Sequence, residues 1–125
     1  NIHVLSMLSK LGSGFDVVSG NELRKCLMAG AKPQSIVFSG VGKTKEEIKL
    51  ALKENIFSIN IESEGELKRI IEVSSSLGTQ ANCFIRVNPN ISAESHPYIQ
   101  TGLRTSKFGV LIPSTSMIRL PAHSP

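Results

Sequence analysis

The stretch IVFSGVGKTKEEIKLALKENIFSINIE, residues 36–62, decides the fold class of this chain. Its first five residues form a short apolar run that is typical of a buried strand, and residues 57–62 form a second one. Between these runs, Thr44 and Glu47 have the spacing of a capping box, which marks the start of a helix. A strand, a helix and a second strand in this order predict a βαβ unit.

The same alternation continues on both sides of this unit. Short apolar runs predict strands near 15–19, 36–40, 57–62 and 81–88, with helical patterns before the first run and between the runs. Alternating strands and helices place the chain in the α/β class with a parallel sheet. Four units fit either a small doubly wound sheet or half of a (β/α)8 barrel, and the periodicity leaves both open.

The size and composition of the chain argue against several classes of protein. The 125 residues suit one modest domain. The net charge is +4, but most Lys and Arg residues stand in mixed runs such as 43–54, and aromatic residues make up only 5%. We interpret such runs as solvated helix faces, so the charge does not predict nucleic-acid binding. No apolar run approaches the roughly 20 residues that span a bilayer, and no secretory signal pattern is present.

The cysteines and histidines predict neither a metal site nor a disulfide framework. Cys26 and Cys83 lie far apart without a CxxC pair, and His3, His96 and His123 lack the spacing of metal ligands. Cysteines of this kind indicate a reducing, cytoplasmic environment.

Polar residues are expected at the carboxyl ends of the strands, where parallel α/β folds bind ligands. Asp16 and Arg86 stand out, because each is a charge inside an apolar run and is costly there unless it is paired. An ion pair with each other, or with neighbours, would explain them without a functional role. The other polar residues at these ends are Ser19, Ser39, Gly40, Asn60, Glu62, Ser63 and Asn88.

Two further segments bear on function. SGVGKT at 39–44 ends like a phosphate-binding loop, but Val37 stands where the first glycine of that motif belongs, so we expect a tight strand-to-helix turn. Residues 88–109 predict a long polar loop, and such loops are commonly functional or disordered. Residues 110–125 carry three prolines and no periodicity, so we expect a poorly ordered tail.

Five segments of the chain, in order and without large gaps, resemble diaminopimelate decarboxylases. These segments are SGFDVVSGNEL (13–23), IVFSGVGKTKEEI (36–48), NIESEGEL (60–67), IRVNPN (85–90) and HPYIQTGLRTSKFG (96–109). The family is the fold-type-III group of pyridoxal-phosphate (PLP) decarboxylases, related to ornithine decarboxylase and alanine racemase. Its fold is a PLP-binding (β/α)8 barrel followed by a β-rich domain. The resemblance therefore implies that residues 1–109 are about half of such a barrel, with 110–125 outside the family pattern.

The resemblance also implies roles for single residues. Asp16 corresponds to an acidic residue close to the cofactor and its lysine, and Arg86 to an arginine that reaches toward the ring hydroxyl of PLP. An arginine at that position would favour the ionised hydroxyl. Glu62 and Lys107 correspond to an acid and a lysine that pair across the interface of the family's homodimer. His96 falls in a loop near the active site.

The residue that forms the Schiff base with PLP is expected outside this chain. Asn1 resembles the last residue of the family's Y-A-x-K-A-N motif, which places the lysine two residues before the chain begins. We therefore assign no catalytic residue within the chain and expect it to be inactive alone. With two unpaired strand edges, it is also expected to be prone to aggregation.

The function implied by the resemblance is that of a fragment of a PLP-dependent meso-2,6-diaminopimelate decarboxylase. That enzyme releases CO2 from its amino-acid substrate to form L-lysine, in the cytoplasm or, in a plant, in the plastid. Two alternatives stay open. One is a related decarboxylase that acts on ornithine, arginine or carboxynorspermidine. The other is a non-catalytic, truncated homologue that binds a partner.

Overall fold

Four short parallel strands form the central sheet of the chain. The computed structural model describes residues 1–88 and 109–111. Within them the sheet has the order β1-β2-β3-β4, and every neighbouring pair is parallel. The strands are β1 (Phe15–Val17), β2 (Ile36–Phe38), β3 (Ser58–Ile61) and β4 (Cys83–Ile85). The α/β class and the parallel sheet predicted from the sequence are therefore confirmed.

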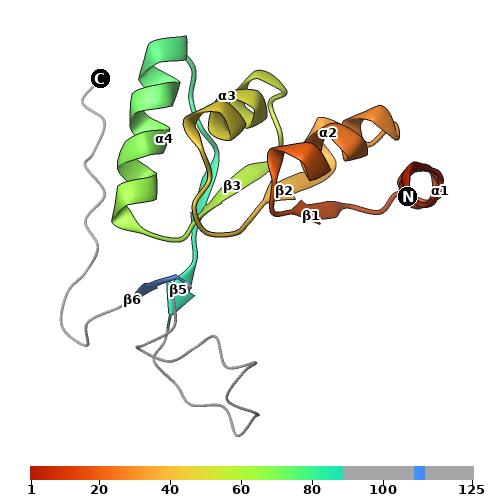
Figure 1. Cartoon of the computed structure of the whole chain (residues 1–125), viewed down its shortest axis with the longest axis horizontal. Coiled ribbons are helices and arrows are strands. Elements are labelled where there is room, and N and C mark those ends of the chain that lie inside the picture. The colour runs from red at the N-terminus through yellow and green to blue at the C-terminus, as the bar shows by residue number, and fades with distance from the viewer. Residues whose placement is uncertain (89–108, 112–125) are drawn as a thin grey trace, which may run out of the picture.

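Helices connect these strands and lie on one face of the sheet (Figure 1). α1 contacts α2, α2 contacts α3 and α3 contacts α4, so the helices form one continuous layer. A doubly wound sheet carries helices on both of its faces. The single layer matches part of a (β/α)8 barrel and decides between the two architectures. The helices are α1 (Ile2–Lys10), α2 (Gly20–Met28), α3 (Lys45–Lys53) and α4 (Glu64–Leu77), with a 3-10 turn η1 at Pro33–Ser35.

The core lies between the sheet and the helix layer. Each of the large side chains buried there contributes about 1.5–3 kcal/mol to folding. Those that are almost completely buried are Leu23, Ile36, Phe38, Ile48, Ile59 and Ile70, which come from α2, α3, α4 and the two central strands. In contrast, α1 contains no buried residue.

The strands are shorter than the sequence predicts, and the expected last residue of the first one serves a helix instead. This residue, Ser19, is the N-cap of α2 and accepts a hydrogen bond from the Glu22 amide. Ser63, which follows the strand predicted at 57–62, caps α4 in the same way. A side chain that caps a helix satisfies a backbone amide that would otherwise lack a partner.

The strand expected at 81–88 is divided into two pieces. β4 stays in the central sheet, whereas β5 (Val87–Asn88) forms a separate two-stranded pairing with β6 (Val110–Leu111). The expected poorly ordered tail at 110–125 lies outside the described residues, apart from the two residues of β6. Most of the long loop predicted at 88–109 lies outside them as well.

Candidate functional site

Polar side chains gather on the face of the sheet opposite the helix layer, which we call the open face. Ile36 and Phe38 are buried toward the helices, so Val37 and Ser39 between and after them point to the open face. The parallel register extends this alternation to the other strands. The open face therefore carries Asp16, Val18, Val37, Ser39, Ser58, Asn60, Glu62, Phe84 and Arg86.

A hollow of about 470 Å³ lies at the carboxyl ends of the strands on this face. Five of the polar residues expected at the strand ends line it: Asp16, Ser39, Gly40, Asn60 and Arg86, together with Val18, Phe84 and Ile85. Asp16 and Arg86 thus come from the two outer strands, or directly after them, and belong to one concave surface. A concave site with a few convergent polar groups is the usual form of a small-molecule site.

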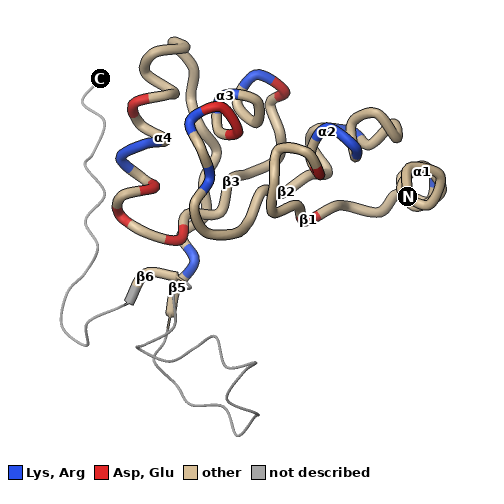
Figure 2. Tube along the Cα trace, in the orientation of Figure 1, with Lys and Arg blue, Asp and Glu red and all other residues tan. Residues whose placement is uncertain are grey.

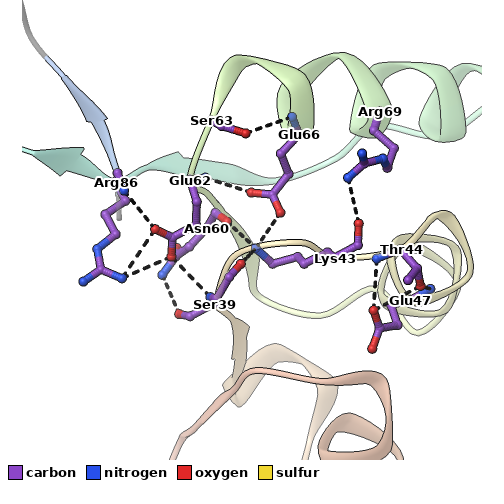
Figure 3. Close-up of polar contacts among 12 residues, drawn as sticks. Ser39, Lys43, Thr44, Glu47, Asn60, Glu62, Ser63, Glu66, Arg69 and Arg86 are labelled. Atoms are coloured by element: carbon purple, nitrogen blue, oxygen red, sulfur yellow. Dashed lines mark hydrogen bonds and ion pairs between the residues drawn. The ribbon is translucent and has the colours of Figure 1, made fainter. Parts of the chain in front are cut away.

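Arg86 forms its ion pair with Glu62 and not with Asp16 (Figure 3). The distance from Arg86 Nη1 to Glu62 Oε1 is 3.2 Å, and the Arg86 side chain is 41% exposed whereas the Glu62 side chain is 2% exposed. The sequence suggested that Arg86 pairs either with Asp16 or with a neighbour, and the structure shows the pair with a neighbour. The pair leaves a cation at the rim of the hollow with a buried carboxylate behind it.

Glu62 joins three segments of the chain. Its carboxylate accepts hydrogen bonds from the amides of Gly40 and Gly109, each at 3.2 Å, in addition to its contact with Arg86. These donors follow β2 and precede β6, so the side chain fixes the end of the sheet to the small β5–β6 pairing. Lys107 and His96 lie outside the described residues. The pair between Glu62 and Lys107 across a dimer interface therefore stays a prediction.

Lys43 is a buried residue that the sequence analysis placed incorrectly. Both signs of charge do mix along α3 and α4 (Figure 2), as the run 43–54 predicts. Lys43 itself, however, is only 3% exposed, and its ammonium donates to the carbonyls of Gly40 and Asn60, both at 2.7 Å. It also forms an ion pair of 3.2 Å with Glu66, whose side chain is 3% exposed. A lysine in a glycine-rich turn directly after a strand was the available signal.

A second polar pair lies on the open face. The Asn60 amide donates to the Ser39 hydroxyl at 2.9 Å. Two residues earlier on β3, Ser58 is completely buried, and its hydroxyl has no hydrogen-bond partner within the described part of the chain. The open face therefore carries a hydrogen-bonded pair that lines the hollow.

The surroundings of the two cysteines disfavour their thiolate forms. Burial raises the pKa of the Cys26 thiol, and the nearby Glu22 carboxylate adds to this effect. Burial also raises the pKa of the Cys83 thiol. Because the nucleophile is the thiolate, both shifts disfavour nucleophilic chemistry. Residues 1–88 and 109–111 contain no group of three His, Cys, Asp or Glu side chains that could hold a metal ion.

The sequence model of the pyridoxal-dependent decarboxylase family, pyridoxal binding domain, matches residues 1–123 of this chain. The chain belongs to this family. The resemblance found in the sequence is therefore confirmed. No helix in the described part of this decarboxylase-family chain is long and apolar enough to cross a membrane.

Several bacterial diaminopimelate decarboxylases are similar to the chain. The enzyme of Vibrio cholerae is 48% identical over 124 residues, which are 99% of this chain and 30% of the relative. That of Helicobacter pylori strain J99 is 56% identical over 110 residues, which are 88% of this chain and 27% of the relative. The chain thus spans less than a third of the length of these relatives.

Solved structures agree with the fold. Diaminopimelate decarboxylase from Helicobacter pylori, complexed with L-lysine, matches with a TM-score of 0.84 at 53% identity, covering 89% of this chain and 28% of that one. The enzyme from M. jannaschii in complex with L-lysine matches with a TM-score of 0.81 at 43% identity, covering 90% and 26%. A viral arginine decarboxylase, from Paramecium bursaria Chlorella virus, shares the fold at 19% identity, with a TM-score of 0.67 and coverage of 85% and 27%.

Proposed function

We propose that this chain is the pyridoxal-binding part of a meso-2,6-diaminopimelate decarboxylase, which releases CO2 from its substrate and forms L-lysine. Two features support the substrate class. The relatives described above are diaminopimelate decarboxylases that share 48% and 56% sequence identity with the chain, and two related solved structures contain L-lysine. The arginine decarboxylase shares only the fold, at 19% identity, so the ornithine- and arginine-type alternatives have less support.

The proposal rests on the position of Arg86. Its guanidinium lies at the rim of the hollow at the carboxyl ends of the strands, the usual place of ligands in parallel α/β folds. A guanidinium there suits the ring hydroxyl of PLP in its ionised form, because the charge-assisted hydrogen bond stabilises the anion. Asp16, on the far outer strand, would face the same cofactor. The residues present thus fit a planar ring with an ionised hydroxyl.

The chain's residues would bind and orient the cofactor. PLP itself supplies the electron sink that accepts the electron pair left when CO2 departs. Arg86 would hold the ring hydroxyl and Asp16 would lie near the cofactor, and the apolar Phe84 lines the same hollow as these two residues. His96 would belong to a loop near the site. We place the whole protein in the cytoplasm as a homodimer, with Glu62 and Lys107 near its interface.

The activity of the full-length gene product tests the reaction. We expect CO2 release from meso-2,6-diaminopimelate that depends on added PLP and exceeds the release from ornithine and arginine. A preference for ornithine or arginine would contradict the substrate assignment. A gene product with an intact mass near 13.5 kDa that releases no CO2 would instead favour the non-catalytic homologue that binds a partner.

Substitution of Arg86 tests the site. Arg86→Ala in the full-length protein removes the cation at the rim, so we expect PLP affinity to fall at least about tenfold, the value of one charge-assisted hydrogen bond. Arg86→Lys keeps the charge and should restore part of the affinity. The measurement is a spectroscopic titration of the cofactor-free protein with PLP. Arg24→Ala, at an exposed arginine on α2, is the matched control and should bind PLP normally. Equal affinity of Arg86→Ala and Arg24→Ala would contradict the role of Arg86.

A further inference from the structure

Behind the hollow, four charged residues form one connected chain of contacts through their side chains and one backbone amide, which we call the Lys43 network (Figure 3). It runs from Lys43 to Glu66, from Glu66 to Glu62 and from Glu62 to Arg86. The steps are an ion pair of 3.2 Å between Lys43 and Glu66, a hydrogen bond of 2.8 Å from the Glu62 amide to Glu66 Oε2, and the ion pair of 3.2 Å between Glu62 and Arg86. Only Arg86, at the end of the network, is substantially exposed.

The ammonium group of Lys43 makes all of its hydrogen bonds within the protein. A lysine ammonium has three N–H donors, and Lys43 has three acceptors: the carbonyls of Gly40 and Asn60 and the carboxylate of Glu66. The carbonyl of Gly40 follows β2, and that of Asn60 lies near the carboxyl end of β3. The ammonium therefore fixes the ends of two neighbouring strands to the first turn of α4.

Glu66 passes this constraint to Glu62. One of its carboxylate oxygens binds Lys43, and the other accepts the hydrogen bond of the Glu62 amide. The backbone of Glu62 is thereby held where its own side chain reaches Arg86. Burial of these charges is costly, and it is tolerated only when each group is paired and hydrogen-bonded.

From these contacts we propose that Lys43 and Glu66 are positioning residues that set the place of the Arg86 guanidinium at the cofactor site through Glu62. Neither residue touches the cofactor in this arrangement. The inference rests on the proposed function, since it requires Arg86 to face PLP. It explains why two buried charges lie directly behind a site on the open face, where apolar residues would fill the same space at less cost.

A second ion pair between the same two helical segments provides a matched control. Lys45 on α3 and Glu72 on α4 lie 2.7 Å apart, but their side chains are 61% and 63% exposed. Exposed pairs of this kind contribute little to stability. In the described part of the chain this pair lies outside the Lys43 network, so its removal should leave PLP binding unchanged.

The test uses the full-length protein with three variants of the network: Glu66→Gln, Lys43→Met, and the double variant with both changes, which avoids an unpaired buried charge. Two readouts are recorded for each variant: PLP affinity by titration, and the absorbance spectrum of bound PLP, which reports the ionisation of its ring hydroxyl. A merely structural role would change thermal stability and leave the spectrum of the bound cofactor unchanged.

We expect each network variant to bind PLP at least about tenfold more weakly, with an altered absorbance spectrum, and the Lys45→Met/Glu72→Gln control to match the unmodified protein in both readouts. If a single variant does not fold, the double variant decides by the same two readouts. Folded variants with unchanged affinity and spectrum would overturn the inference. Comparison with Arg86→Ala separates the two proposals. If Arg86→Ala weakens PLP binding and the network variants do not, only the positioning role of Lys43 and Glu66 fails. If Arg86→Ala has no effect on PLP binding, the proposed function of Arg86 fails.

Discussion

Gly40 shows how one residue without a side chain allows the site to form. Its φ of +89° lies in the left-handed region, and a Cβ atom added there would lie 3.3 Å from Val18 Cβ. Its amide donates to Glu62 and its carbonyl accepts from Lys43. Glycine is required here both by the backbone conformation and by the close approach of Val18.

Gly42 provides a comparison for the effect of an alanine substitution at Gly40. It also has a positive φ, of +79°, but an added Cβ there would meet nothing within 4 Å. Gly42→Ala should therefore cost only the conformational term, about 1–2 kcal/mol in the free energy of unfolding. Gly40→Ala should cost about 1 kcal/mol more, because the new methyl group also displaces Val18. Urea denaturation of both variants measures this, and equal losses would show that the Val18 contact is relieved without cost.

Among the elements, α2 and α3 share one capping carboxylate. Glu47 accepts hydrogen bonds from the amide and hydroxyl of Thr44, which complete the capping box of α3. Its other oxygen accepts from the amide of Gly20, the first residue of α2, at 2.8 Å. One side chain thus satisfies amides at the start of two helices that pack together. These backbone hydrogen bonds, chiefly that of Thr44 and then that of Gly20, lower the pKa of Glu47.

The lowered pKa predicts how stability depends on pH. A carboxyl group with a depressed pKa in the folded protein stabilises it above its ordinary pKa, about 4.3 for glutamate, and this contribution is lost as the pH falls through the folded value. Glu47→Gln should therefore reduce the free energy of unfolding at pH 7 by about 1–2 kcal/mol. The difference from the unmodified protein should shrink below pH of about 4. Denaturant unfolding across this pH range measures it, with Glu46→Gln, exposed in the same helical turn, as control. A loss for Glu47→Gln that is constant with pH would contradict the argument.

Local signals explain which elements the sequence predicts well. The capping box of α3 and the β-branched runs of the strands depend on neighbours in the chain, and they appear at their predicted places. The ends of strands are less predictable, because a residue such as Ser19 could extend a strand or cap a helix. For Lys43 the sequence offers only the glycine-rich turn as a signal, since two of its three acceptors, Asn60 and Glu66, are distant in the sequence. The same holds for Arg86, whose partner Glu62 becomes its neighbour only when β3 and β4 pair.

On the scale of the whole chain, the described part is a layered slab and not a closed barrel (Figure 1). The helix layer covers one face of the sheet, while β1 and β4 are each paired on one side only in the described residues. Beyond the edge strand β1, α1 and its C-cap residue expose apolar side chains: Ile2, Val4, Met7 and Leu8 on the helix, and Leu11 at the cap. Unpaired edges and exposed apolar surface of this kind favour association with further protein.

The apolar surface of α1 predicts the behaviour of the 125-residue chain when it is produced alone. We expect it to self-associate, because α1 has no buried residue, and Met7 on this helix is 64% exposed and Leu11 at its C-cap 77% exposed. Replacing Val4, Met7 and Leu11 by Gln keeps helix-compatible residues and removes most of this surface, so the triple variant should be more monomeric at equal concentration. Size-exclusion chromatography with light scattering measures this, and circular dichroism verifies that the fold persists. A Lys49→Gln/Lys53→Gln variant on the exposed face of α3 controls for the change in composition. A monomeric unmodified chain would contradict the prediction. If the chain associates and the triple variant associates equally, the open edges of the sheet rather than α1 determine its association.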